Sequence, residues 1–308
     1  MNRAIAVTGF LLAAGFGASP ALGQGPESPS GAQADPIEPI VTAMRAAEGR
    51  LKSLRLELLT SGHYGKDTEF STEGTLHVLR GEQTRVRSSV QFVYADGLRS
   101  RMESARTAAG ITIYSADPVF GELYLRVPPS VVLDLEWAGK VLDRSDLPGM
   151  HDARAEAPLG SAMLDDLRTH FDLRAKPEKR RGPDAGIWLA GDRRPGLGDV
   201  DPALPLADRV ELFVRDADHA LLEVVQYQGD AVLQRIEVRA LEVDVEIPEA
   251  VWTVDGNGQP LRGVEKHQPM WAQIENTLAR AEAKLLPADL AAGEDPPPEC
   301  LRPSRRAK

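Results

Sequence analysis

The fold of this 308-residue chain is decided by residues 208–254, which read DRVELFVRDADHALLEVVQYQGDAVLQRIEVRALEVDVEIPEAVWTV. Three short segments of this stretch, residues 210–214, 222–226 and 232–238, place apolar side chains at alternating positions. Short polar turns that contain Asp and Gly separate the three segments. An alternation of period two between short turns predicts antiparallel strands joined as hairpins.

The third of these segments changes phase in its middle. Its apolar residues occupy even positions up to Val238 and odd positions from Leu241 onward, so the change falls near Arg239. A change of phase within a strand predicts a β-bulge or a bend, because one extra residue moves the following side chains to the other face. A bulge at this place favours a strongly curved sheet.

The order of these strands and turns resembles the C-terminal half of periplasmic lipoprotein carriers of the LolA/LolB-like family. The matching residues are 210–214 (VELFV), 227–229 (YQG), 236–238 (IEV) and 245–248 (VEIP). The resemblance is clearest over residues 159–252 and weaker over residues 37–127. It implies a half-barrel that shields acyl chains in a concave cavity and catalyses no reaction.

A second match to the same family concerns residues 74–81, which read GTLHVLRG. The family has an early strand of the form G-x-L-x-V-x-R-P, whose arginine points inward, bonds to lid helices and keeps the cavity closed. Arg80 corresponds to that arginine, although Gly81 replaces the family's proline, and the resemblance therefore implies a gating role for Arg80. From chemistry alone, an arginine on the apolar face of a strand either finds acceptors such as helix-end carbonyls or reaches water past the strand end.

Apolar alternation predicts further strands on both sides of a helical break. They fall near residues 54–58, 74–80, 84–94, 98–107, 111–114, 122–127, 170–175 and 186–190. Helical spacing predicts helices over residues 36–51, 128–138 and 158–171. This order predicts an α+β fold, in which one strongly curved antiparallel sheet forms an open half-barrel and helices plug its concave face.

The two ends of the chain differ in composition from its middle. Arg3 precedes an apolar stretch and a small-residue cleavage site, which predicts a signal peptide over residues 1–23 and export to the periplasm. An uncleaved membrane anchor is the alternative. Residues 24–35 are rich in Pro, Gly and Ser and predict a disordered leader. A carrier-like domain over residues 36–255 and a C-terminal extension over residues 256–308 follow.

The extension is predicted to contain one amphipathic helix and a basic disordered tail. The apolar stripe of the helix consists of Trp271, Ile274, Leu278, Ala281 and Leu285. Such a helix either docks on the sheet or serves as a lid or a partner-binding element. The final residues are Pro-rich and then basic, which predicts disorder.

Composition and motifs argue against several classes of function. The net charge of −10 disfavours nucleic acid as a partner, and a single cysteine excludes an internal disulfide. No histidine pair has a zinc-binding spacing, and no nucleophile elbow or phosphate-binding glycine loop is present. Asp199 and Asp201 are interpreted as solvated turn residues and Cys300 as an unreactive thiol. The sequence therefore predicts no enzyme, no cofactor and no metal site.

The apolar strand residues are the candidates for a ligand-binding surface. Aromatic residues make up only 5% of the chain, and a curved sheet without aromatic bulk must fill its concave side with helices or with a ligand. The predicted cavity wall consists of Leu76, Val78, Val86, Val90, Phe92, Leu123, Leu125, Val210, Leu212, Val224 and Ile236. Alternating apolar strand residues also form ordinary core, so both interpretations apply to each of them.

These observations together predict a periplasmic carrier that binds lipid or lipoprotein acyl chains. The alternative is a periplasmic sensor or regulatory scaffold of the same fold that binds a membrane protein partner. The C-terminal extension favours this alternative, because carriers of the family usually end near their last strand.

Overall fold

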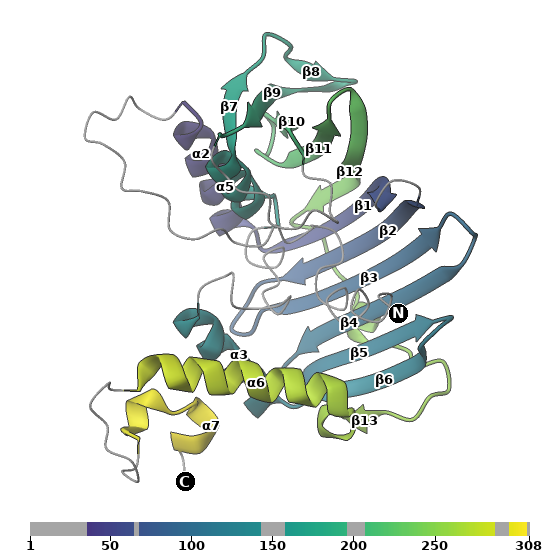
Figure 1. The fold of residues 1–308 in the computed structure, drawn as a ribbon, viewed down its shortest axis with the longest axis vertical. Helices are drawn as coiled ribbons and strands as arrows, with labels where there is room; N and C mark the ends of the chain where they lie inside the picture. Colours follow the sequence, from purple (N-terminus) through teal and green to yellow (C-terminus); the bar gives the residue numbers. More distant parts are fainter. Residues whose placement is uncertain (1–35, 65–67, 143–157, 196–206, 287–295, 307–308) are drawn as a thin grey trace.

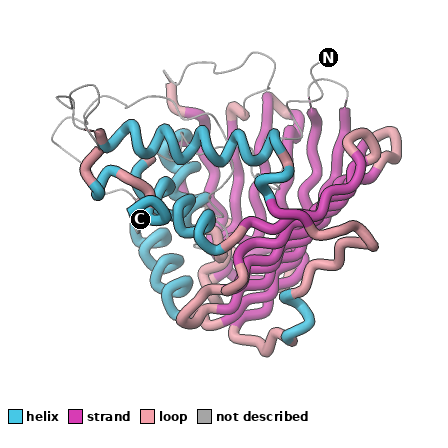
Figure 2. The backbone as a smooth tube through the Cα atoms, turned by 90° about the horizontal axis from the view of Figure 1, so that it is seen from below, coloured by secondary structure: helices cyan, strands magenta, loops and turns pink. Residues whose placement is uncertain are grey.

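The computed structural model describes residues 36–64, 68–142, 158–195, 207–286 and 296–306. The predicted signal peptide and leader lie outside the described residues. One large sheet dominates the described part of the chain, and it curves around helices that lie on its concave face (Figures 1 and 2).

The first half of the sheet is a meander of antiparallel strands. Its members are β1 (Ser53–Tyr64), β2 (Thr68–Leu79), β3 (Arg85–Tyr94), β4 (Arg99–Thr107), β5 (Gly110–Asp117) and β6 (Gly121–Val127). Each corresponds to a predicted strand. Strands β1 and β2 extend beyond the predicted ranges. The prediction missed their outer parts, because these parts contain Thr, Ser, Gly and Glu and show no apolar alternation.

The second half is another antiparallel meander. Its members are β7 (Phe171–Ala175), β9 (Asp184–Arg193), β10 (Arg209–Arg215), β11 (Leu221–Gln228) and β12 (Ala231–Val243), and the short β8 (Arg180–Arg181) pairs with β9. Strand β12 returns to the first half and pairs with β1. The strand order is therefore β6-β5-β4-β3-β2-β1-β12-β11-β10-β9-β7, and the described sheet is open rather than closed into a barrel.

The predicted irregularity near Arg239 is confirmed. Glu57 on β1 pairs with Ala240, whereas the next residue, Leu58, pairs with Val238. Arg239 therefore has no pairing partner on β1 and forms a bulge at the junction of the two meanders. Because a bulge increases the local twist and bend, it accounts for part of the curvature between the two halves.

Helices α2 (Glu38–Arg50) and α5 (Ser161–His170) cover the concave face over β1, β2 and the second meander (Figure 1). Their apolar stripes follow the helical spacing and meet even-numbered residues of β1 and β2. We call the resulting cluster the α2–α5 core. It includes Val41 and Met44 of α2, Leu164 and Leu167 of α5, and Leu54, Leu56, Leu76, Val78, Leu212, Val224 and Ile236 of the sheet.

Helices α3 (Pro129–Val141) and α6 (Gln268–Leu285) cover the concave face over β5 and β6. The α3–α6 core contains Leu125, Val127, Val132, Ala138, Leu142, Val264, Ile274, Leu278 and Ala281. The predicted stripe of the extension thus docks on the sheet, with Trp271 partly buried. Leu285, at the end of the stripe, is 38% exposed. Residues of the C-terminal extension therefore complete a core whose other half comes from β5, β6 and α3.

The chain reaches α6 by crossing the convex face of the first meander. Asp244, with a positive φ of 54°, ends β12. The following segment contacts the convex face through an ion pair between Glu249 and Arg85 at 2.7 Å and a hydrogen bond from the Tyr124 hydroxyl to the Val254 carbonyl at 2.9 Å. Strand β13 (Arg262–Gly263) then pairs in parallel with β6 at the edge of the sheet. The last part of the chain thus wraps around this edge before α6 begins.

The prediction of a disordered basic tail needs a correction for residues 296–306. They form a short 3-10 turn (Pro298–Cys300) and the helix α7 (Pro303–Arg306), which lie against α3 and α6. Cys300 and Arg302 are buried. Hydrogen-bond acceptors on α3 and α6 stabilise the conformation of this segment. Because these acceptors are remote in sequence, the local composition of the segment does not indicate them.

Candidate functional site

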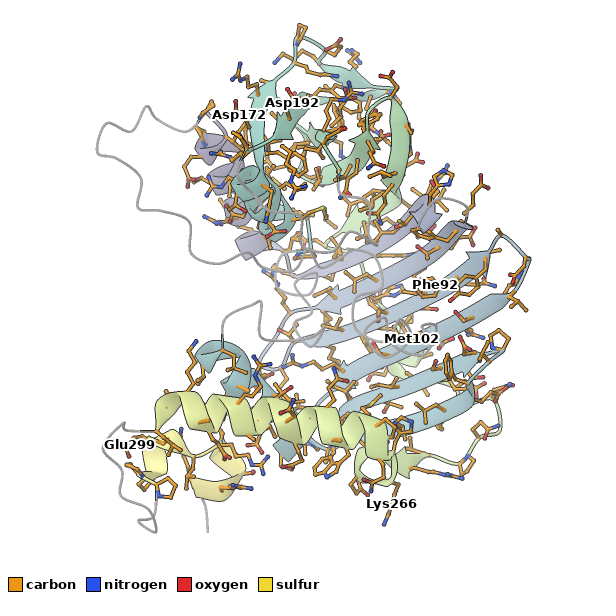
Figure 3. All side chains as sticks on the ribbon, viewed as in Figure 1. Phe92, Met102, Asp172, Asp192, Lys266 and Glu299 are labelled. Atoms are coloured by element: carbon orange, nitrogen blue, oxygen red, sulfur yellow. The ribbon has the colours of Figure 1, made fainter. Side chains whose placement is uncertain are left out.

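The candidate site is the concave face of β3 and β4, between the two cores. Because side chains alternate along a strand, Val86, Ser88, Val90 and Phe92 of β3 share one face. The register places Val90 opposite Met102 of β4. We call the residues Ser88, Val90, Phe92, Ser100, Met102 and Ser104 the central strip. Figure 3 shows Phe92 and Met102 in the middle of the sheet, between the two groups of helices.

The central strip combines three apolar side chains with three serines. Val90 and Phe92 are 4% and 7% exposed, yet neither belongs to the α2–α5 core or the α3–α6 core. The Ser88 and Ser104 hydroxyls lie 2.7 Å apart and hydrogen-bond to each other across β3 and β4. The strip thus combines aliphatic and aromatic walls with paired hydroxyls, a surface that suits an apolar chain carrying a few polar atoms.

The structure divides the predicted cavity wall among three places. The α2–α5 core contains Leu76, Val78, Val86, Val210, Leu212, Val224 and Ile236. The α3–α6 core contains Leu125, with Leu123 packed against it. Of the predicted wall residues, only Val90 and Phe92 lie in the central strip. Sequence reasoning missed Met102 and Ser104, because strand β4 reads RSRMESART and carries no apolar alternation. It missed Ser88 of β3 because a serine interrupts the apolar positions of that strand.

Arg80 makes the kind of contact predicted for it. Its guanidinium donates to the backbone carbonyl of Glu48, in the last turn of α2. The same carbonyl also accepts the Leu51 amide at 3.3 Å, so the Arg80 guanidinium is a second donor to a carbonyl oxygen that has two lone pairs. The contact joins the end of β2 to a helix that covers the concave face. Its role in holding a cavity closed stays a prediction.

The Glu48 side chain connects the same helix to α5. Its carboxylate is 4% exposed and accepts hydrogen bonds from the Leu159 amide and the Ser161 amide, each at 3.1 Å, and from the Ser161 hydroxyl. It thereby satisfies amides at the start of α5, where the N-cap residue Gly160 has no side chain to do so. A carboxylate at a helix N-terminus is also favoured by the helix dipole.

Ion pairs on the surface strengthen the connection between α2 and α5. Arg45 of α2 pairs with Asp165 of α5, and Arg168 of α5 pairs with Glu38 of α2. The Arg168 guanidinium lowers the pKa of the Glu38 carboxyl, mainly through their hydrogen bond. Together with Glu48 and Arg80, these pairs join α2, α5 and β2 by polar contacts around an apolar core.

On the convex face, His77 lies between two arginines. Its Nδ1 atom is buried and has no hydrogen-bond partner in the described part of the chain. Burial lowers the pKa of His77, and the nearby Arg55 and Arg87 lower it further, against a smaller opposing effect of Glu57. His77 lies on the face opposite the central strip, so it takes no part in the candidate site.

Groups suited to metal binding were sought in the described ranges. No cluster of three or more His, Cys, Asp or Glu side chains there is placed to hold a metal ion. Asp199 and Asp201 lie outside the described residues. The expectation that the chain has no enzyme activity and no cofactor stays a prediction.

Comparison with known proteins gives weak structural similarity and no sequence match. No protein-family model and no curated protein matches the chain. A chain of the Pseudomonas aeruginosa MucA/MucB complex is similar at 14% identity and a TM-score of 0.40, over 72% of this chain and 62% of that one. This chain thus spans less than two thirds of that relative's length.

Two further structures align over nearly their whole length. An uncharacterized conserved protein from Thermus thermophilus has 12% identity and a TM-score of 0.37, over 73% of this chain and 98% of that one. A LolA superfamily protein from Nitrosomonas europaea has 8% identity and a TM-score of 0.27, over 71% and 97%. These similarities are too low to assign the chain to a family. Within the described residues, we find no helix long and apolar enough to span a membrane.

Proposed function

We propose that the protein is a periplasmic carrier that binds the acyl chains of a lipid or lipoprotein along the central strip and catalyses no reaction. The observation that supports this proposal is the position of Val90 and Phe92. Both are apolar residues on the concave face, and both lie between two packed cores without belonging to either. The strip runs along two neighbouring strands, and its apolar side chains match the chemistry of an acyl chain.

The energetics favour an apolar ligand at this place. Burial of acyl methylenes contributes about 0.8 kcal/mol each, so a chain that covers the strip gains affinity from many small contacts. The hydroxyls of Ser88 and Ser104 satisfy each other, so an apolar chain that covers them leaves neither without a partner. The predicted export of the chain places this activity in the periplasm.

The proposed role of Arg80 follows from its bond to the end of α2. Movement of α2 and α5 away from the sheet would widen access to the strip from the side of the second meander. Such movement breaks the bond between the Arg80 guanidinium and the Glu48 carbonyl. We therefore assign Arg80 a gating role, in which it holds the helices against the sheet until cargo arrives.

The first experiment is native mass spectrometry of the exported protein, purified without detergent, followed by lipid extraction. A bound acyl species at near-stoichiometric occupancy supports the carrier. The variant Met102→Asp places a charge in the strip without disturbing either core, so lipid occupancy should be lost. Gln91→Asp on the convex face, opposite Arg101, is the matched control and should bind as the wild type does. A folded Met102→Asp protein with normal lipid occupancy would exclude the central strip as the binding site.

A partner-binding scaffold is the second candidate function. It is favoured by the peptide-like contact of residues 296–306 with α3 and α6, whose chemistry does not involve acyl chains. If the protein carries no lipid after mild purification, and Met102→Asp changes none of its interactions, the scaffold becomes the better interpretation.

A further inference from the structure

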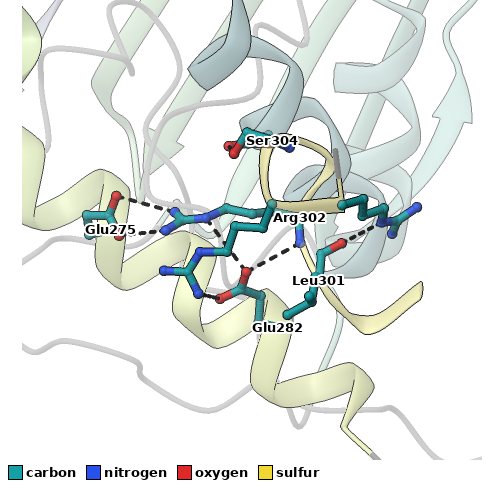
Figure 4. A network of polar contacts seen from close by, with 8 residues as sticks. Glu275, Glu282, Leu301, Arg302 and Ser304 are labelled. Atoms are coloured by element: carbon teal, nitrogen blue, oxygen red, sulfur yellow. Dashed lines mark hydrogen bonds and ion pairs between the residues drawn. The ribbon is translucent and has the colours of Figure 1, made fainter. Parts of the chain in front are cut away.

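Residues 296–306, which we call the C-terminal strap, lie against α3 and α6, and Figure 4 shows the polar contacts of the strap. The strap begins after residues 287–295, which lie outside the described part of the chain. Its longest regular element is the four-residue helix α7. Such a short helix has no stability of its own, so the conformation of the strap depends on its contacts with α3 and α6.

Arg302 is the central anchor of the strap. Its side chain is 9% exposed and pairs with Glu275 at 3.1 Å and with Glu282 at 3.6 Å, and its backbone amide donates to Glu282 at 3.3 Å. Glu275 and Glu282 are two turns apart, so both project from the same face of α6. A planar guanidinium held between two carboxylates is a geometry that arginine fits and lysine does not.

Ser304 is the second anchor, and it binds the neighbouring helix. Its backbone amide and its hydroxyl donate to the two oxygens of the Asp134 carboxylate on α3, at 2.9 Å and 2.5 Å. Asp134 is 3% exposed. A carboxylate so deeply buried needs donors, because an unpaired buried charge is strongly destabilising. The two helices therefore present three carboxylates, Asp134, Glu275 and Glu282, which we call the acidic docking surface.

The contacts of the strap resemble those of a bound peptide rather than those of a core element. The surface contacts the sequence Arg302-Pro303-Ser304 through one guanidinium, two backbone amides and one hydroxyl. Among the described residues, Arg306 bonds only to carbonyls of the strap itself, those of Leu301 and Glu299. Because the strap is covalently attached to the rest of the chain, its effective concentration near the surface is high. This favours the strap over a free peptide of the same sequence.

We propose that the acidic docking surface is a binding site for an arginine-containing peptide segment of a partner protein, and that the C-terminal strap occupies it in cis until such a segment replaces it. The ligand chemistry is an extended basic peptide with arginine, then proline, then a residue bearing a hydroxyl. The site lies on α3 and α6 and shares no residue with the central strip, so its occupancy does not depend directly on acyl chains.

The single cysteine of the chain reports whether the strap is docked. Cys300 is 6% exposed and its thiol donates to the Leu285 carbonyl at 3.1 Å. In the full-length wild type, a thiol-reactive dye should label it slowly. In Arg302→Ala, labelling should be at least about ten-fold faster, because loss of the anchor releases the strap. Arg174→Ala, which removes an exposed ion pair to Asp172 on β7, away from the strap, is the control and should label at the wild-type rate.

Binding in trans is tested with a fluorescent peptide of residues 296–308 that carries Cys300→Ser. It should bind the full-length Arg302→Ala protein, whose surface is vacated, at least about ten-fold more tightly than the wild type, whose strap competes. The same peptide with Arg302→Ala should not bind. A Glu275→Gln and Glu282→Gln protein, which keeps the shape of both side chains, should label rapidly at Cys300 and should not bind the peptide.

Three outcomes would overturn the proposal. Labelling of Cys300 could be equally slow in wild type and in a folded Arg302→Ala protein. The peptide could bind wild type and Arg302→Ala equally well, or bind neither. Protection of Cys300 could also increase with protein concentration, which would show that the strap of a second copy occupies the surface.

Discussion

In both halves of the sheet, two helices cover an apolar concave face, but different contacts hold these helices in place. In each half, the two helices are far from each other in the sequence. Helices α2 and α5 are joined to each other and to β2 by polar groups: Glu48, Arg80 and two surface ion pairs. Helix α6 is joined to β5, β6 and α3 mainly by apolar packing, and its polar side binds the C-terminal strap.

This difference predicts that the two halves open as separate units. Opening of α2 and α5 exposes Val41, Met44 and Leu164 and also breaks the polar contacts of Glu48 and Arg80. Opening of α6 exposes Ile274, Leu278 and Ala281. Proteins open locally in cooperative units of different stability, so the two halves can be compared directly.

The largest effect is expected from truncation of core side chains. Leu278→Ala and Leu164→Ala each leave a cavity at a fully buried site and should lower the free energy of unfolding by about 2–5 kcal/mol. Hydrogen exchange should accelerate around α3 and α6 in the first variant and around α2 and α5 in the second. Leu285→Ala, at an exposed position, is the control. Equal acceleration throughout the sheet in both variants would contradict a division into two halves.

The next effect concerns the buried carboxylate of the α2–α5 half. Glu48→Ala removes the acceptor of two amides and one hydroxyl at the start of α5. Each buried donor left without a partner costs about 1–3 kcal/mol, so urea denaturation should show a loss of at least about 2 kcal/mol. Glu38→Gln, which weakens an exposed ion pair on the same helix, should have a much smaller effect. A Glu48→Ala protein as stable as Glu38→Gln would disprove the connecting role of Glu48.

A smaller effect is expected from Arg80. Arg80→Leu removes the donor to the Glu48 carbonyl, and the loss of a partly buried hydrogen bond should cost about 1 kcal/mol. Hydrogen exchange in α2 should accelerate, and bound lipid should dissociate faster, while exchange in α6 stays unchanged. Arg85→Leu, which removes an ion pair on the convex face, serves as the control. Unchanged exchange in α2 would show that Arg80 only terminates its strand.

The smallest effect is a pH dependence of stability from His77. Its pKa in the folded protein lies below the ordinary value of 6.5, so the unfolded chain takes up the proton first as the pH falls. Its contribution to stability is present above pH 6.5 and is lost below it. In His77→Gln, the melting temperature should fall less between about pH 7.5 and about pH 5.5 than in the wild type. Burial also lowers the pKa of His267, so part of the dependence should remain. An unchanged pH profile would contradict this assignment.

Much of the local structure followed from the sequence. The hairpins of β10, β11 and β12, the bulge at Arg239 and the apolar stripe of α6 each follow from a repeat of two residues or of one helical turn. The central strip was predicted only in part: Val90 and Phe92 belong to an alternating strand, but Met102 lies in a strand of arginines and serines. Most of the predicted wall residues are core, because alternation indicates which face is apolar and not what covers it.

The sequence by itself determined the elements of this protein: which segments are strands, where a strand bulges, and which helices are amphipathic. Only the tertiary structure decided that the C-terminal segment wraps around the sheet edge, that α6 completes the core of β5 and β6, and that the final residues dock on Asp134, Glu275 and Glu282. The physical reason is the range of the interactions. Periodicity reflects contacts within one element, whereas the order of the strap depends on carboxylates that stand far away in the sequence and close in space.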